Sequence, residues 1–295
     1  MTLPPDLRTE IEAALAAGGV ARRIRNDAPV GGGCISPAAR IEAEGGARFF
    51  VKWSERGAPA DFFTSQADGL RALDRAAAVR VPGVEAVGER WLLLEWLDPG
   101  SATRDTWTSL GRQLAALHRE SAPAFGAATD NYIGSLAQSN GRCETWPAFW
   151  VDRRIGRQWE QARQRGFFDE ADERAFRQLC AAIPDALAAG DADGPSLLHG
   201  DLWGGNVHVM ADGAAALIDP STYHGHREVD LAMAELFGGF PREFFVAYRE
   251  AWPLEPGYDS ARRDLYQLYY LLVHVNLFGS GYTGGVRRVL RPFGR

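Results

Sequence analysis

One stretch of this sequence constrains the fold more than any other: residues 197–221, LLHGDLWGGNVHVMADGAAALIDPS. It holds Asp201, then Asn206 five positions later, and Asp219 eighteen positions after Asp201, with short strand-like pieces around them. In phosphoryl transfer, a loop aspartate orients the acceptor hydroxyl and takes its proton, while an asparagine and a second aspartate hold Mg²⁺ between nucleotide phosphates. Mg²⁺ prefers hard oxygen ligands and keeps several waters, so few protein ligands suffice. The stretch therefore predicts a phosphoryl-transfer site with Asp201 as catalytic base and Asn206 and Asp219 as metal ligands.

Lys52 is the only lysine in the chain, because the 32 lysines and arginines include 31 arginines (32 − 1). It stands in RFFVKWSER, on a predicted strand that follows a glycine-rich stretch. Arginine is a planar fork, whereas lysine is a slim point charge on a flexible stem. A narrow slot beside nucleotide phosphates favours lysine, and we interpret Lys52 as a contact to the α- and β-phosphates.

Two further segments of the first hundred residues fit a nucleotide site. GGGCIS, at residues 31–36, is a glycine-rich loop that can fold over phosphates or simply be flexible. The apolar run LLLEWL is interpreted as a connector whose backbone reads adenine, although its glutamate is also compatible with a solvent-facing strand position. Together these segments supply the following predicted ATP-binding residues: Gly31, Gly32, Gly33, Cys34, Ile35, Glu95, Trp96 and Leu97.

The first part of the chain reads as a small β-rich lobe. Residues 6–17 and 61–78 have helical patterns, and the runs AARIEAE and ARFFVKW flank Gly45-Gly46 as a hairpin. VRVPGVEAVGERWLLLEWLD predicts two more strands. The lobe is expected to end near Pro99-Gly100.

From residue 104 onward amphipathic helices dominate, and strand-like pieces recur only near 196–219. We therefore predict an α+β, two-lobed fold. Residues 1–98 form a nucleotide-binding lobe, and residues 99–295 form a larger, mainly helical lobe for catalysis and substrate.

Composition excludes several function classes. The net charge of −6 and a pI of about 5.6 argue against nucleic acid as a partner. The three cysteines are scattered without a CxxC pair, so neither a disulfide framework nor a cysteine zinc site is indicated. No signal-peptide pattern and no apolar run long enough for a membrane span is visible, so we expect a cytoplasmic protein with no membrane partner.

From about residue 20 to 285, the chain resembles the fructosamine kinase (ketosamine-3-kinase) family. That family lies within the aminoglycoside-phosphotransferase-like branch of the protein-kinase-like fold. The resemblance is carried most specifically by HGDLWGGN and by GHREVDLAM with the following LFGGF. It implies a kinase that uses ATP and Mg²⁺ to phosphorylate the 3-hydroxyl of a ketoamine, a sugar attached to an amine. For glycated proteins, the resemblance implies that phosphorylation destabilises the sugar adduct, which then detaches from the protein. This process is deglycation.

The resemblance also assigns roles to single residues. Asp201 becomes the base and Asn206 and Asp219 the metal ligands, as the motif itself predicts. Trp203 is expected to stack on the sugar, the alternative being that its ring packs under the loop. His274, on the aromatic-rich C-terminal helix, is a candidate acceptor contact or a core histidine.

Two supporting roles and two departures complete the comparison with the family pattern. His199 is expected to hydrogen-bond within the loop, and Asp230 to anchor that loop through backbone N–H groups. Gln66 occupies the helix position that usually supplies an acidic partner for the nucleotide-site lysine, and it completes the predicted ATP-binding set. We expect it to be the neighbour of Lys52 and to hydrogen-bond its ammonium, the alternative being that another acid takes over. His224 stands where an aromatic residue is commoner, and it is expected either to tune the pocket or to fill space.

Cys34, in the glycine-rich loop, prompts a separate hypothesis of a redox-sensitive thiol. Backbone N–H groups around such a loop favour an anion, which lowers a thiol pKa. A small packing residue is the alternative.

Three other functions remain open from sequence. A kinase of the same fold acting on an aminoglycoside or choline shares most of these motifs. A pseudokinase is suggested by Gln66. A metallohydrolase is suggested by the histidines and aspartate between residues 199 and 226, but it explains neither the glycine-rich loop nor Lys52.

Overall fold

The computed structural model describes residues 2–19, 23–31, 36–54 and 58–294. Its contacts divide the chain into two compact units. Unit 1 comprises Met1–Thr106 and Val207–Asp219, and unit 2 comprises Trp107–Asn206 and Pro220–Arg295. The sequence predicts two continuous lobes, 1–98 and 99–295. The first compact unit is instead discontinuous, because it takes in a later hairpin.

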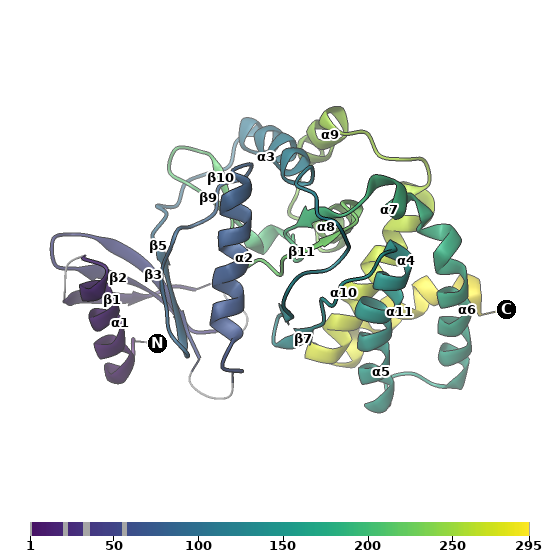
Figure 1. The fold of residues 1–295 in the computed structure, drawn as a ribbon, viewed down its shortest axis with the longest axis horizontal. Helices are drawn as coiled ribbons and strands as arrows, with labels where there is room; N and C mark the ends of the chain where they lie inside the picture. The colour runs from purple at the N-terminus through teal and green to yellow at the C-terminus, as the bar shows by residue number, and fades with distance from the viewer. Residues whose placement is uncertain (1, 20–22, 32–35, 55–57, 295) are drawn as a thin grey trace. The chain divides into compact units, whose positions relative to one another are not determined.

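Unit 1 is built on a five-stranded antiparallel sheet in the order β1-β2-β3-β5-β4. One helix lies on each side of this sheet (Figure 1). The elements are α1 (Pro5–Ala17), β1 (Ile24–Pro29), β2 (Ala38–Ala43), β3 (Arg48–Trp53), α2 (Phe62–Ala76), β4 (Val84–Val87) and β5 (Trp91–Glu95).

The hairpin between β2 and β3 agrees with its sequence prediction. Gly45 and Gly46 have φ values of 91° and 85°, which suit the two central positions of a tight hairpin turn that glycine adopts without strain. The helices α1 and α2 and the strands β4 and β5 were also predicted. The strand β1 was not, because its sequence, IRNDAP, lacks an apolar alternation.

Side chains alternate between the two faces of β3, which decides where Lys52 lies. Phe49, Val51 and Trp53 belong to the buried core that also contains Leu7 and Ile11 of α1. Because successive residues of a strand point to opposite faces, Lys52 lies on the face away from α1. The lysine is nevertheless buried, with 6% of its surface exposed.

A second hairpin joins unit 1 from later in the chain, β9 (Val207–Val209) with β10 (Ala215–Leu217). The backbone of Leu217 donates to the Arg80 carbonyl at 2.8 Å, and that of Gly100 donates to the Val209 carbonyl at 2.8 Å. These bonds tie the hairpin to unit 1, and Asp219 lies two residues after the end of its second strand.

Unit 2 is mainly helical, as predicted, and it is arranged around α10 (Arg263–Phe278), of which 11 of the 16 residues are buried. A helix that is apolar over most of its circumference belongs mainly in a core. α3 (Arg104–Leu117) begins in the last residues of unit 1 and continues in unit 2. The other helical elements are α4 (Trp146–Phe149), the π-helix η1 (Trp150–Ile155), α5 (Gly156–Gln164), α6 (Glu170–Ala186), α7 (Ala188–Asp193), η2 (Gly204–Asn206), α8 (Glu228–Leu236), α9 (Arg242–Ala251), η3 (Tyr258–Arg262), η4 (Ser280–Tyr282), α11 (Thr283–Leu290) and η5 (Arg291–Phe293).

Two short antiparallel pairs complete unit 2. β6 (Asn131–Ile133) pairs with β7 (Leu136–Gln138), and β8 (Ser196–Leu198) pairs with β11 (Tyr223–Gly225). The loop that carries Asp201 starts directly after β8. The pairing of β8 with β11 therefore fixes the point from which this loop leaves the core.

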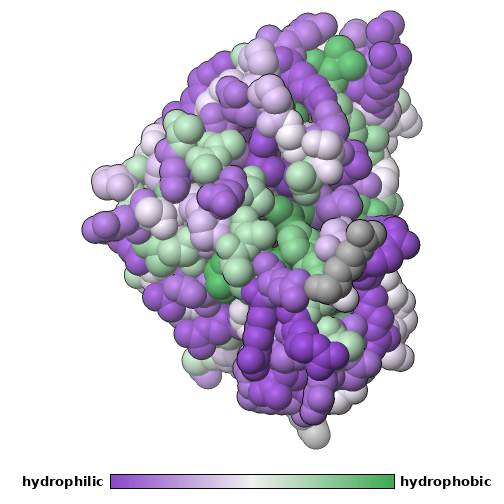
Figure 2. Space-filling view, turned by 90° about the vertical axis from the view of Figure 1, so that its right-hand side faces the viewer, coloured by the Kyte–Doolittle hydropathy of each residue, from purple (hydrophilic) through white to green (hydrophobic). Residues whose placement is uncertain are grey.

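Hydrophilic residues interrupt the hydrophobic areas of the face shown in Figure 2. Over the residues that the structure describes, no helix is both long and apolar enough to cross a membrane.

Candidate active site

The loop after β8 brings two of the predicted catalytic residues into direct contact. The Asn206 side-chain amide donates to the backbone carbonyl of Asp201 at 2.8 Å and to its carboxylate at 3.2 Å. The Asp201 backbone N–H donates to Nδ1 of His199, which is fully buried. The histidine therefore has a hydrogen-bonding place inside the loop, as the sequence suggested. The Asp201 carboxylate is held in one orientation by the asparagine.

Asp230, at the start of α8, anchors this loop through its carboxylate. Its two carboxylate oxygens accept the backbone N–H groups of His199 at 2.7 Å and Gly200 at 2.9 Å. The loop carbonyl of Gly200 accepts the hydroxyl of Tyr270 at 2.8 Å. Burial raises the pKa of this tyrosine well above its ordinary value, so the hydroxyl keeps its proton and stays a donor. The role predicted for Asp230 agrees with this geometry.

His118, the residue after α3, is a partner of Asp230 that sequence reasoning missed. Its Nε2 lies 3.1 Å from the Asp230 carboxylate, and its Nδ1 lies 2.8 Å from the Tyr248 hydroxyl. Burial lowers the pKa of His118, although the neighbouring carboxylate opposes that effect. The histidine in LAALHRES was visible in the sequence, but a helix-end histidine has many alternative roles.

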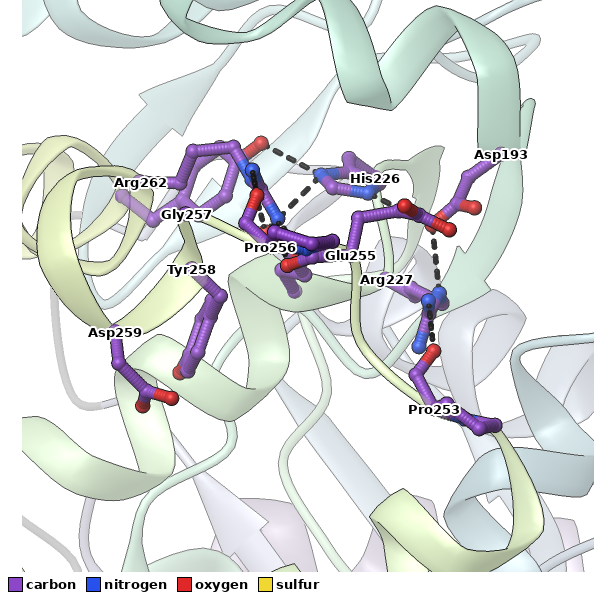
Figure 3. Close-up of polar contacts among 12 residues, drawn as sticks. Asp193, His226, Arg227, Pro253, Glu255, Pro256, Gly257, Tyr258, Asp259 and Arg262 are labelled. Carbon is purple, nitrogen blue, oxygen red and sulfur yellow. Dashed lines mark hydrogen bonds and ion pairs between the residues drawn. The ribbon is translucent and has the colours of Figure 1, made fainter.

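A buried polar network holds the residues just before Asp230 in place (Figure 3). His226 and Arg227 both contact the Asp193 carboxylate, at 3.0 Å and 2.7 Å. Glu228 accepts two hydrogen bonds from Arg262, each 2.7 Å long. Because these partners come from separate helices, the first turn of α8 is fixed on several sides, and Asp230 with it.

Trp203 lies against its own loop. A side-chain carbon built at Gly205 would come within 2.2 Å of the Trp203 ring, so the ring rests on the Gly205 backbone. The ring is also half-buried rather than enclosed. This packing accounts for one face of the indole and leaves the predicted sugar contact a prediction.

His274 lies on α10 among other rings. Its Nδ1 donates to the Tyr270 carbonyl at 2.8 Å, and its ring centroid is 4.5 Å from that of Phe237. Burial lowers the pKa of His274.

His224, which departs from the family pattern, lies in β11, where its backbone pairs with Gly126. Burial lowers the pKa of His224 as well.

In unit 1, Lys52 forms an ion pair with Asp219. The side chain of Lys52 is 8% exposed, whereas that of Asp219 is 47% exposed. Asp219 has a φ of 52°, a left-handed conformation that is uncommon for residues other than glycine and that recurs at functional sites. The predicted phosphate contact and one predicted metal ligand are thus brought together.

Gln66 does not pair with Lys52, which corrects the expectation that it would be the neighbour of this lysine. The buried Oε1 of Gln66 has no hydrogen-bond partner among the described residues. The acid that pairs with the ammonium is Asp219 instead. A carboxylate attracts the buried ammonium more strongly than a neutral amide does, and the β9–β10 hairpin supplies one.

The segment from Glu95 to Leu97 forms polar contacts at both of its ends. The Glu95 carboxylate pairs with Arg80 and accepts the Gly83 backbone N–H at 3.0 Å. The Leu97 carbonyl lies 3.1 Å from Nε2 of His208. The side chain of Glu95 is thus engaged within unit 1, and the adenine-reading role of this segment stays a prediction.

Trp96 and the glycine-rich segment complete the predicted nucleotide set. The Trp96 indole donates to Asp98 at 2.9 Å. Gly31 is exposed, and a side-chain carbon there would meet nothing within 4 Å. Four predicted residues lie outside the described part of the chain, namely Gly32, Gly33, Cys34 and Ile35.

The donors predicted for Mg²⁺ suit that ion chemically. The Asn206 side chain donates to Asp201 through its amide nitrogen. The other polar atom of this amide is its oxygen, Oδ1, which is the donor type that Mg²⁺ would use. Asp219 supplies carboxylate oxygen, and hard oxygen donors are what Mg²⁺ prefers. In the described ranges, no group of three or more histidine, cysteine, aspartate or glutamate side chains is placed to hold a metal.

A model of the fructosamine kinase family matches residues 8–293. The chain belongs to the fructosamine kinase family. It is therefore a phosphotransferase with a hydroxyl group as acceptor, which confirms the reaction class predicted from the sequence.

Relatives of this fructosamine kinase family member agree over nearly its whole length. It is 38% identical over 276 residues to a protein of Synechocystis sp. described as a ketoamine kinase, with 91% of this chain and 90% of that protein covered. It is 36% identical over 282 residues to the chloroplastic protein-ribulosamine 3-kinase of Oryza sativa subsp. indica, with 93% and 80% covered.

Solved structures confirm the kinase-like fold. A Thermobifida fusca protein described as a fructosamine-3-kinase superposes with a TM-score of 0.86 at 36% identity, and 95% of this chain and 96% of that one are covered. A macrolide 2'-phosphotransferase has a TM-score of 0.58 at 15% identity, with 99% and 98% covered. The second likeness shows the fold alone, which is the α+β, kinase-like fold predicted from the sequence.

Proposed function

We propose that this chain transfers the γ-phosphate of ATP to the 3-hydroxyl of a ketoamine, of the fructosamine or ribulosamine type, and so takes part in removing sugars from glycated amines. The observation that carries the proposal is the loop in which Asn206 holds the Asp201 carboxylate while Asp230 anchors the backbone. This is the base-and-asparagine pair that phosphoryl transfer to a hydroxyl requires.

In the proposed reaction, Asp201 orients the acceptor hydroxyl and takes its proton. The hydroxyl oxygen forms a bond to the γ-phosphorus as the bond from that phosphorus to the β-phosphate oxygen breaks, and ADP leaves. Asn206 and Asp219 would hold Mg²⁺, and the chemistry that this ion would supply is neutralisation of charge on the phosphates. Lys52 binds the α- and β-phosphates.

The remaining predicted residues bind the two substrates. Adenine and phosphates lie against Glu95–Leu97 and the glycine-rich segment that begins at Gly31. Trp203 and His274 contact the acceptor sugar.

A screen for ATP consumption tests this proposal. Purified protein is assayed with fructosamines and ribulosamines of lysine, with an aminoglycoside and choline, and with no acceptor. We expect Mg²⁺-dependent ADP release with the ketoamines and a phosphate on the sugar C3 by NMR. Turnover of only the aminoglycoside or choline would assign another acceptor, and ATP binding without any turnover would indicate a pseudokinase.

A further inference from the structure

Four aromatic side chains of unit 2 form a contiguous group, here called the aromatic cluster: Phe237, His274, Phe278 and Tyr282. The His274 ring is at its centre, with centroid distances of 4.5 Å to Phe237, 5.4 Å to Phe278 and 4.9 Å to Tyr282. Phe237 is 40% exposed and Phe278 is 55% exposed. They are two of the three large hydrophobic side chains that are exposed in the described part of the chain. Exposed apolar surface gathered in one place is characteristic of a binding surface.

The aromatic cluster borders the loop that carries Asp201. Phe237 is followed by Gly238 and Gly239, whose backbone packs directly on Gly204 of that loop. A side-chain carbon at Gly204 would lie 3.1 Å from the Gly239 α-carbon, and one at Gly239 would lie 3.0 Å from the Gly204 α-carbon. Contacts this short are tighter than most side-chain contacts, so the two backbones lie close together, and Phe237 immediately precedes the segment that packs on the catalytic loop. The aromatic cluster is therefore continuous with the proposed acceptor site.

The charge of the central ring suits a cation as ligand. The Nδ1–H of His274 donates to the Tyr270 carbonyl, and burial lowers the pKa of the ring, so the imidazole is neutral at neutral pH. A neutral imidazole does not repel a cation. Aromatic faces attract cations through the ring quadrupole, most strongly where water is partly excluded.

The acceptor chemistry places a cation close to the reacting hydroxyl. In a ketoamine, the amine nitrogen is attached to C1 of the sugar, two carbon–carbon bonds from C3. When the carrier is an alkylamine such as a lysine side chain, this nitrogen is protonated at neutral pH. When the carrier is an arylamine, the nitrogen is uncharged.

We propose that the aromatic cluster is a carrier subsite, which binds the alkylammonium group and adjoining methylenes of the amine that bears the sugar. This inference rests on the proposed ketoamine kinase activity and adds to it a preference for alkylammonium over uncharged arylamine carriers. Phe237 and Phe278 supply ring faces to the ammonium, and the apolar stem of the carrier lies along the cluster.

The test compares two adducts of the same sugar, one on the side chain of Nα-acetyl-lysine and one on aniline, in wild type, Phe278→Leu and Phe237→Leu. Leucine retains apolar volume but has no ring. Because exposed cation–π contacts contribute about 0.5–1 kcal/mol, each variant is expected to raise the KM of the lysine adduct about two- to fivefold. The KM of the aniline adduct, the KM of ATP and both kcat values should stay unchanged. Val246→Ala, which alters an exposed hydrophobic residue of α9 outside the cluster, is the matched control.

Equal changes for both adducts, or no change for either, would overturn the carrier subsite while leaving the kinase activity in place. Failure of the proposed function has a different signature, in which the wild type phosphorylates neither adduct. Binding of the two adducts is then measured by isothermal titration calorimetry. If Phe278→Leu does not weaken the affinity for the lysine adduct in this titration, the carrier subsite is wrong.

Discussion

The Lys52 ammonium pairs with the Asp219 carboxylate, although the two residues lie 167 positions apart in the chain. The lysine side chain is nearly buried and the aspartate half-exposed. The pair joins a central strand of the sheet to the end of the β9–β10 hairpin. It thereby links the predicted phosphate contact to a predicted metal ligand.

Lys52→Arg is expected to raise the KM of ATP about tenfold or more, although the charge is kept. A planar guanidinium is wider than an ammonium, and the near-complete burial of the Lys52 side chain leaves little room for it. Arg48→Lys is the matched control, because Arg48 lies on the same strand in an exposed ion pair with Asp98. Steady-state kinetics with varied ATP measure both. If Lys52→Arg and Arg48→Lys behave alike, the special role of this lysine is wrong.

Asp201→Asn is expected to lower kcat by about 10²–10⁴-fold while leaving ATP affinity nearly unchanged, because the acceptor loses its base. Asp212→Asn, in the exposed turn of the β9–β10 hairpin, is the control. Single-turnover kinetics and calorimetric ATP titration separate chemistry from binding. Near wild-type turnover by Asp201→Asn would refute the assignment of the base.

Asp230→Asn is expected to lower the free energy of unfolding by about 1.5–3 kcal/mol for each charged hydrogen bond that is lost, and to lower kcat. An amide cannot accept both loop N–H groups and His118 as a carboxylate does. Asp264→Asn, whose side chain is 56% exposed, provides the comparison. Urea unfolding and kinetics are measured on both variants. Equal stability of the two would show that the anchor contributes little.

Gly205→Ala distinguishes the two roles of Trp203. The added methyl group would collide with the indole ring and displace it, whereas Gly281→Ala meets nothing within 4 Å. If Trp203 contacts the sugar, Gly205→Ala raises the acceptor KM and leaves the ATP KM unchanged. If the ring only packs on the loop, the variant loses thermal stability with no change in acceptor KM.

Stability is expected to fall as the pH drops below about 6.5, the ordinary pKa of histidine. Burial lowers the pKa of His118 in the folded state, so the unfolded chain binds a proton first as the pH falls. Stability is thus fully present above the unfolded pKa and is lost progressively toward the lower, folded pKa. Thermal unfolding between pH 7.5 and 5 measures this loss. In His118→Gln the dependence on pH should be shallower, and an unaltered slope would assign it to other groups, such as His224 and His274.

Local patterns were sufficient for much of the fold. The apolar periodicity of 61–78 predicted α2, and Gly45-Gly46 between two alternating runs predicted the hairpin, because both depend on residues close in the chain. The strand β1 escaped prediction because its pairing with β2, rather than its own sequence, makes it a strand. The motif around Asp201 and Asn206 was also readable, since its residues lie within one loop.

What the sequence by itself determined was therefore the set of candidate residues and their spacing: the predicted base Asp201, Asn206, Asp219 and the single lysine. Which side chains meet was decided only by the tertiary structure. Sequence reasoning named Gln66 as the neighbour of Lys52, with an unidentified acid as the alternative, and the fold brings the acid Asp219 to the ammonium. His118 likewise became a partner of Asp230 only through packing. The physical reason is the same in both cases: a buried charge takes the strongest partner that long-range packing delivers, and neither periodicity nor spacing along the chain encodes that partner.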